Sequence, residues 1–112
     1  MDTAQPDRQP PHFLRQVFRP RMANQEAAEA IALTALAHVL EDTDRAGRFC
    51  TATGLGGAEL AGYVRDPVFL GGVLDFVLDD EALLVEVAAA AQVSPETLAA
   101  ARRRLPGAPV RE

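Results

Sequence analysis

The stretch that decides the fold class is residues 66–92, DPVFLGGVLDFVLDDEALLVEVAAAAQ. Its apolar residues recur at intervals of three and four rather than two, which predicts α-helix and not β-strand. Asp66 can cap a helix that starts at Pro67, because its carboxylate accepts from a free first-turn N–H and proline there gives up no hydrogen bond. Asp79 and Asp80 interrupt the apolar pattern. We therefore expect two apolar helices that form a hairpin.

The first helix of this hairpin is apolar over more than half of its circumference. Its only clear polar stripe consists of Gly71, Asp75 and Asp79, spaced by four. A helix with so much apolar surface is expected to be buried on several sides. The apolar length is too short to cross a bilayer and contains Asp75, so a membrane span is excluded.

Three further helices are expected around the hairpin. The first runs from Asn24 to Leu40 and carries two apolar stripes, one through Ile31 and one through Leu33, so we expect it to be embedded between neighbours. A second starts after an Asp42 or Thr43 cap and continues to about Thr53. A last helix follows the Ser-Pro-Glu start at residues 94–96. No segment alternates as a strand would.

These elements predict an all-α fold, a compact single-domain bundle of five to six short helices around the central hairpin. The domain is expected to span residues 23–107. Residues 1–22 contain four prolines and few apolar residues, and we expect a disordered arm there. Residues 108–112 are expected to be a frayed C-terminus.

Composition narrows the classes of function. The chain has 112 residues and a net charge of −5 with no lysine, and residues 23–112 carry fourteen carboxylates against seven arginines. Such an acidic body argues against general nucleic-acid binding, which depends on neutralising phosphates. One cysteine allows no internal disulfide, and no signal peptide is recognisable, so we expect a cytoplasmic location without membrane attachment.

Few residues suggest catalysis or metal binding. His38 and Cys50 are the only pair that an enzyme could use as base and nucleophile, and the sequence does not tell whether they meet. No set of ligands has metal-site spacing, and the acidic residues 41–44 lack the calcium-loop pattern and resemble caps. We therefore expect no enzyme activity, no cofactor and no metal.

Two features of the sequence, a run of three arginines and a glycine-rich turn, suggest contacts with anions. Arg102, Arg103 and Arg104 could bind an anion, but consecutive helical residues point in different directions and are also suited to a helix C-terminus. The turn Gly54–Gly57 resembles faintly the turn of helix-hairpin-helix DNA-binding proteins. A phosphate at this turn, assisted by the Arg-bearing tails, is the basis of an alternative function in DNA association.

A family resemblance covers nearly the whole expected domain. The segments EAAEAIALTALAHVLEDTDRAGRFCTATGL, LAGYVRDPVFLGGVLDFVLDDEALLVEVA and SPETLAAARRRLPG are similar to an uncharacterised bacterial domain-of-unknown-function family, number 3572. The resemblance implies a small all-α protein over about residues 24–107. It implies no activity and no site residues.

The favoured function is therefore a non-enzymatic helical protein-interaction or adaptor module. Abundant apolar helix surface favours a protein partner or a homodimer. The expected partner-binding surface is an acidic rim at the hairpin, which would suit an arginine-rich partner. The rim consists of Asp75, Asp79, Asp80 and Glu81.

Overall fold

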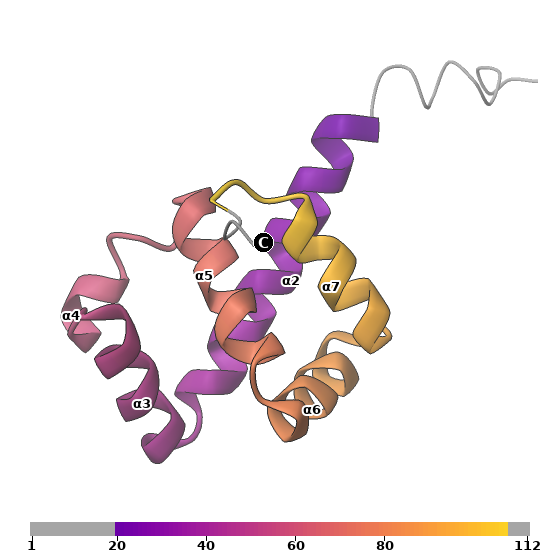
Figure 1. The fold of residues 1–112 in the computed structure, drawn as a ribbon. Helices are drawn as coiled ribbons and strands as arrows, with labels where there is room; N and C mark the ends of the chain where they lie inside the picture. The colour runs from indigo at the N-terminus through magenta and orange to yellow at the C-terminus, as the bar shows by residue number, and fades with distance from the viewer. Residues whose placement is uncertain (1–19, 108–112) are drawn as a thin grey trace, which may run out of the picture.

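Six helices follow one another in the computed structural model, which describes residues 20–107 and their side chains from residue 24 onward (Figure 1). No strand occurs in this part of the chain. The all-α class is confirmed, whereas residues 1–19 of the expected arm and the expected frayed end at 108–112 lie outside the described residues. The helices are α2 (Pro20–Leu40), α3 (Thr43–Thr53), α4 (Gly57–Leu60), α5 (Pro67–Leu78), α6 (Glu81–Ala91) and α7 (Pro95–Arg103).

Side-chain caps start four of these helices. Each capping oxygen accepts a hydrogen bond from a backbone N–H of the first turn at 2.9–3.2 Å, which satisfies a donor that has no partner within the helix. The helix starts predicted from the sequence in residues 42–95 are therefore confirmed. The caps are Asp42 of α3, Asp66 of α5, Asp80 of α6 and Ser94 of α7.

The predicted start of the first helix is wrong. Helix α2 begins at Pro20, so Asn24 lies inside the helix instead of capping it. Proline suits the first helical position, and Arg21, Met22 and Ala23 favour helix by intrinsic propensity. Residues 20–22, which we expected in the arm, therefore form the first turn of α2.

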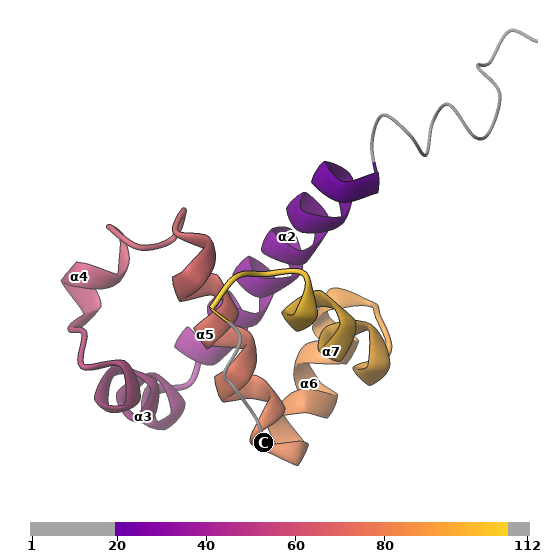
Figure 2. The same ribbon diagram turned by 45° about the horizontal axis from the view of Figure 1, so that its top comes forward.

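Helix α5 occupies the centre of the bundle. It lies in front of α2 in Figure 1, with α3 and α4 on one side and α6 and α7 on the other, and the turned view in Figure 2 keeps this order. Helix α2 contacts α3, α5, α6 and α7. The central position of α5 is confirmed by its apolar side chains with 1% exposure or less, Leu70, Val73, Leu74 and Val77.

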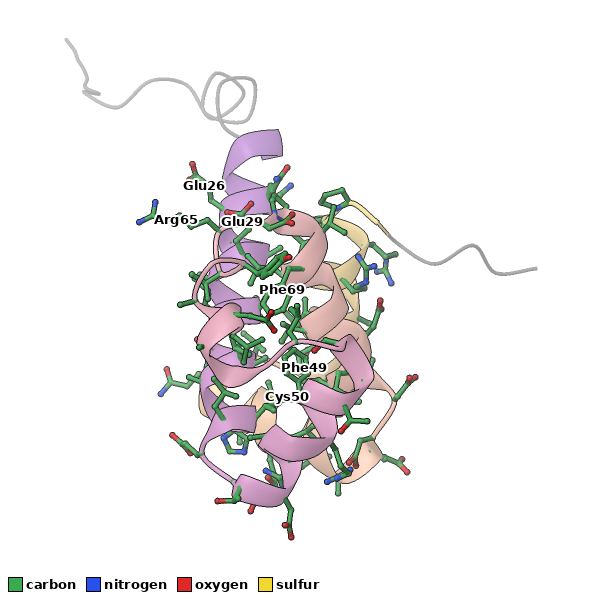
Figure 3. All side chains as sticks on the ribbon, turned by 90° about the vertical axis from the view of Figure 1, so that its left-hand side faces the viewer. Glu26, Glu29, Phe49, Cys50, Arg65 and Phe69 are labelled. Carbon is green, nitrogen blue, oxygen red and sulfur yellow. The ribbon has the colours of Figure 1, made fainter. Side chains whose placement is uncertain are left out.

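Aromatic side chains join α3 to α5. The Phe49 ring of α3 is fully buried, and its centroid lies 6.0 Å from that of Phe69 and 5.2 Å from that of Phe76, both edge to face. Such pairs stabilise beyond the burial of their area. Figure 3 shows Phe49 and Phe69 in the interior beside α3. Phe49 therefore closes this side of the core.

Helix α2 contacts four other helices but is covered on one face only, so the expectation that it is embedded between neighbours is met in part. Its inner face carries Ala28, Ala32, Ala35, Leu36 and Val39, all buried. On the opposite face Leu33 is 42% exposed and Leu40 41% exposed. Figure 3 shows α2 along one edge of the bundle. The second apolar stripe of the sequence, Leu33, Leu36 and Leu40, is therefore divided, because Leu36 is buried whereas Leu33 and Leu40 are exposed.

Candidate functional site

The expected acidic rim is divided by the fold. Asp79 and Glu81 are exposed where α5 meets α6. Asp80 is half-buried, and its Oδ1 accepts from the Leu83 N–H at 3.2 Å as the cap of α6. Asp75 lies one turn earlier on α5 and has a different environment. Two of the four carboxylates, Asp79 and Glu81, thus remain exposed and without a structural role in the described contacts.

Asp75 forms an ion pair with Arg102 of α7. The Arg102 Nε donates to Asp75 Oδ1 at 2.7 Å, and Nη2 donates to Oδ2 at 3.1 Å. This is the two-point arrangement in which a guanidinium matches a carboxylate most closely. Asp75 therefore holds α5 and α7 together, and its charge is already compensated within the fold.

The remaining donors of Arg102 bind the end of the described chain. Nη1 donates to the Leu105 carbonyl at 3.2 Å and to the Pro106 carbonyl at 3.4 Å, while Nη2 donates to the Gly107 carbonyl at 2.9 Å. All five N–H groups of a guanidinium are thus accounted for. Arg102 is 6% exposed, and full pairing explains how the charge tolerates burial.

Gly71 makes room for this arginine. A Cβ at Gly71 would lie 2.6 Å from Arg102 Nη1 and 3.0 Å from the Pro106 carbonyl oxygen. The stripe of Gly71 and Asp75, polar in sequence, therefore faces α7 and not solvent. Arg103 and Arg104 are exposed, so the three arginines do not form one anion site.

A second polar cluster joins the end of α2 and the start of α3 to the middle of α6. The Glu86 carboxylate lies 3.0 Å from His38 Nε2 and 2.9 Å from Arg45 Nη2. The hydrogen bond with His38 and the positive charge of Arg45 lower the pKa of Glu86 below its ordinary value of 4.5. Since Glu86 is 45% exposed, this cluster is a surface contact between helices.

His38 and Cys50 do not form a catalytic pair in this arrangement. His38 Nε2 faces Glu86, and Nδ1 lies 3.9 Å from Glu41, so both ring nitrogens are directed at carboxylates. Cys50 is a half-buried free thiol on α3 that packs against the core. A thiol nucleophile requires a base within hydrogen-bond reach, and within residues 24–107 no hydrogen bond joins the two side chains.

The Gly54–Gly57 turn uses its backbone donors internally. Gly54 has a φ of 75° and its N–H binds the Cys50 carbonyl at 2.8 Å, as in a helix end closed by a left-handed residue. The Gly56 N–H binds the Glu59 carboxylate at 2.6 Å, and the Leu55 N–H binds the Thr53 hydroxyl at 3.3 Å. A carboxylate thus occupies the place where a phosphate would bind.

Sequence reasoning missed the uncovered face of α2. The α2 stripe, defined as Ala30, Leu33, Ala37 and Leu40, is exposed at all four positions. Its intervals of three and four repeat as in the seam of a coiled coil. That heptad spacing was visible in the sequence, but the wider apolar surface of α2 did not reveal which stripe faces the core.

The surface of the described residues is hollowed beside α3 and between α2 and α7. A depression of about 500 Å³ runs along one face of α3 and is lined by Thr43, Asp44, Gly47, Arg48, Thr51 and Ala52. A groove of about 190 Å³ separates α2 from α7, with Ala28 and Ile31 on one wall and Ala101 and Arg104 on the other. Neither hollow combines enclosing apolar walls with convergent polar groups, the combination typical of small-ligand sites.

The described residues contain no candidate metal cluster and no candidate membrane span. From residue 24 to 107, no three His, Cys, Asp or Glu side chains gather in a way that could hold a metal ion. None of the helices between residues 20 and 103 combines the length and apolar character needed to cross a membrane.

Comparison with known proteins gives one match. The family model described as "Protein of unknown function (DUF3572)" matches residues 25–108. No curated protein and no solved structure matches the chain. The matched range includes the α2 stripe, the Asp75–Arg102 pair and the cluster of Glu86, His38 and Arg45.

Proposed function

The chain belongs to the family described as protein of unknown function (DUF3572), a description that names no activity, and we propose that it is a non-enzymatic protein-interaction module. The observation that carries this proposal is the α2 stripe. Leu33 and Leu40 each keep about two fifths of their side-chain surface exposed, at 42% and 41%. A contiguous apolar surface of this kind is typical of a binding face.

The stripe has the geometry of a helix-binding surface. Residues spaced by three and four on one helix lie on one face, and a partner helix can pack along them. The same helix supplies Leu36 and Val39 to the core on its other side. A partner bound at the stripe would therefore contact a rigid element of the fold.

The acidic rim is a secondary part of the proposed surface. Of its members, Asp79 and Glu81 are exposed, and an arginine-rich partner would be attracted to them. The double variant Asp79→Arg/Glu81→Arg tests this part separately. If partner capture at low salt is unchanged in that variant, the rim does not contribute to binding.

The test of the interaction module is capture of partners by the folded, full-length chain. We expect Leu33→Glu to abolish capture, because it places a charge in the apolar stripe. Val85→Glu is the matched control, since Val85 is 58% exposed on α6 and outside the stripe. Circular dichroism checks that both variants fold. If Leu33→Glu changes neither partner capture nor self-association, the proposal is wrong.

DNA association is the alternative, with less support. It depends on a phosphate at the Gly54–Gly57 turn and on the Arg-bearing tails. The Glu59 carboxylate bound to the Gly56 N–H at 2.6 Å would repel that phosphate. A titration with duplex DNA at low salt, where phosphate contacts are strongest, decides the question. Absence of binding there removes the alternative.

A further inference from the structure

The pattern of side-chain size along the α2 stripe indicates a particular partner. Small and large residues alternate in the order Ala30, Leu33, Ala37, Leu40. When two such helices pack side by side, closest approach is reached if each leucine faces an alanine, because large residues then fill the space left by small ones. A second copy of the same stripe provides this match when it runs in the opposite direction.

Two antiparallel registers place Leu33 against an alanine of the second copy, either Ala37 or Ala30. The register with Ala37 brings Glu29 opposite Glu41, and like charges across an interface repel, so the register with Ala30 is favoured. In antiparallel packing, aligning Leu33 with Ala30 of a second copy also aligns Ala30 with Leu33, by symmetry. Glu26 lies on the same line of α2 and meets Ala37 in this register, where its carboxylate can extend past the small side chain to solvent. Symmetric parallel packing, in which each residue faces its own copy, instead places leucine against leucine and Glu26 against Glu26.

The charges at the two ends of α2 favour the same direction. The first turn of α2 contains no acidic residue, and the helix dipole makes this end of the helix positive. Glu41, Asp42 and Asp44 follow the last turn and are exposed. Antiparallel packing brings the positive end of one copy to the acidic end of the other, and it also pairs opposite ends of the two helix dipoles.

We propose that the α2 stripe is a self-association surface at which two copies of the chain pack α2 against α2 in antiparallel orientation, with Leu33 of each copy facing Ala30 of the other. This inference rests on the proposed interaction function and names its partner. One helix face is small compared with the roughly 800 Å² per partner of a standard interface, so the dimer is weak and forms at micromolar concentration or above.

Sedimentation velocity of the full-length chain tests self-association, over concentrations up to about 1 mM. We expect the mass to rise toward twice that of the monomer. We expect Leu33→Glu to weaken the dimer at least about tenfold, and Val85→Glu to leave it unchanged. A chain that stays monomeric throughout, or a dimer that tolerates Leu33→Glu, overturns the proposal.

Single cysteines test the orientation. In a Cys50→Ala background, Ala30→Cys and Leu33→Cys variants that differ in mass by a tag are mixed and mildly oxidised. Antiparallel packing predicts that the disulfide between the two variants dominates. Predominant linkage of Leu33→Cys to itself indicates parallel packing and contradicts the proposed register.

The two proposals fail in different ways. If the chain is monomeric but Leu33→Glu abolishes capture of another protein, the stripe binds a different partner and the dimer is wrong. If neither self-association nor capture depends on Leu33, the interaction function itself is wrong.

Discussion

Helices α5 and α2 are the two apolar elements around which the fold is built, but they are covered differently. On α5 the apolar side chains are buried, and the stripe of Gly71 and Asp75 is occupied by Arg102. On α2 one face is buried, whereas Leu33 and Leu40 on the other face have no covering helix. The comparison teaches that a polar interruption can mark a side of a helix that another helix covers, and an apolar stripe the open side.

The largest expected effect separates the two faces of α2. Leu36 is 5% exposed, so Leu36→Ala leaves a cavity and should lower the free energy of unfolding by about 2–5 kcal/mol. Leu33→Ala removes the same atoms from the open face and should cost about 0.5–1 kcal/mol. Urea unfolding at low protein concentration, where any dimer is dissociated, measures both. Equal losses would show that both faces are covered.

The next effect tests the closed side of α5. Asp75→Ala leaves the buried Arg102 charge without its carboxylate. We expect a loss of about 2–3 kcal/mol, below the range for a fully buried pair because Asp75 is 35% exposed. Thermal or urea unfolding measures the loss. Asp79→Ala, an exposed carboxylate at the end of the same helix, is the control and should change stability little; a similar loss in both would contradict a specific role for the pair.

A smaller effect distinguishes two neighbouring glycines of α5. An added methyl group at Gly71 meets the guanidinium of Arg102, which cannot move away without breaking its hydrogen bonds. We expect Gly71→Ala to destabilise by about 1–2 kcal/mol. Gly72 has no atom within 4 Å of its Cβ position, and Gly72→Ala should stabilise by up to about 1 kcal/mol through helix propensity. The unfolding midpoint of each variant is compared with that of the wild type. If both variants shift it in the same direction, the expected difference between the two glycines is refuted.

The smallest effect concerns the exposed Glu86 cluster and depends on pH. The pKa of Glu86 is lowered in the fold by its hydrogen bond with His38 and by Arg45, so ionised Glu86 stabilises the folded state. This contribution is present above the ordinary carboxyl pKa and is lost as pH falls through the lowered pKa. The stability difference between wild type and Glu86→Gln should therefore vanish in acid. Urea unfolding of both proteins across the acid range measures this difference, and a difference that persists in acid would contradict the role of the ionised carboxylate.

Much of the fold was predictable because local chemistry determines it. The caps at Asp66 and Ser94 act through backbone groups a few residues away, so the sequence alone located these helix starts. The three-and-four spacing of apolar residues located α5 at the centre for the same reason. The start of α2 was missed because a proline followed by helix-forming residues was treated as part of a proline-rich arm.

The candidate site was less predictable because it depends on distant residues. Asp75 and Arg102 are 27 positions apart, and nothing local shows that an exposed-looking carboxylate meets a buried guanidinium. Glu86 and His38 are likewise 48 positions apart. For α2, two apolar stripes were recognised, but only the packing of α3, α5, α6 and α7 determines which of their residues are covered.

The most direct test of the account is the exposure of individual leucine methyl groups to a soluble paramagnetic reagent, measured by NMR on the full-length chain. In dilute solution we predict strong relaxation at Leu33 and Leu40 and weak relaxation at Leu36 and Leu74. As the protein concentration rises, relaxation should decrease at Leu33 and Leu40 alone, because a second copy covers them. If Leu33 is as protected from the reagent as Leu74 in dilute solution, this face of α2 is covered, which contradicts the open face on which both proposals depend.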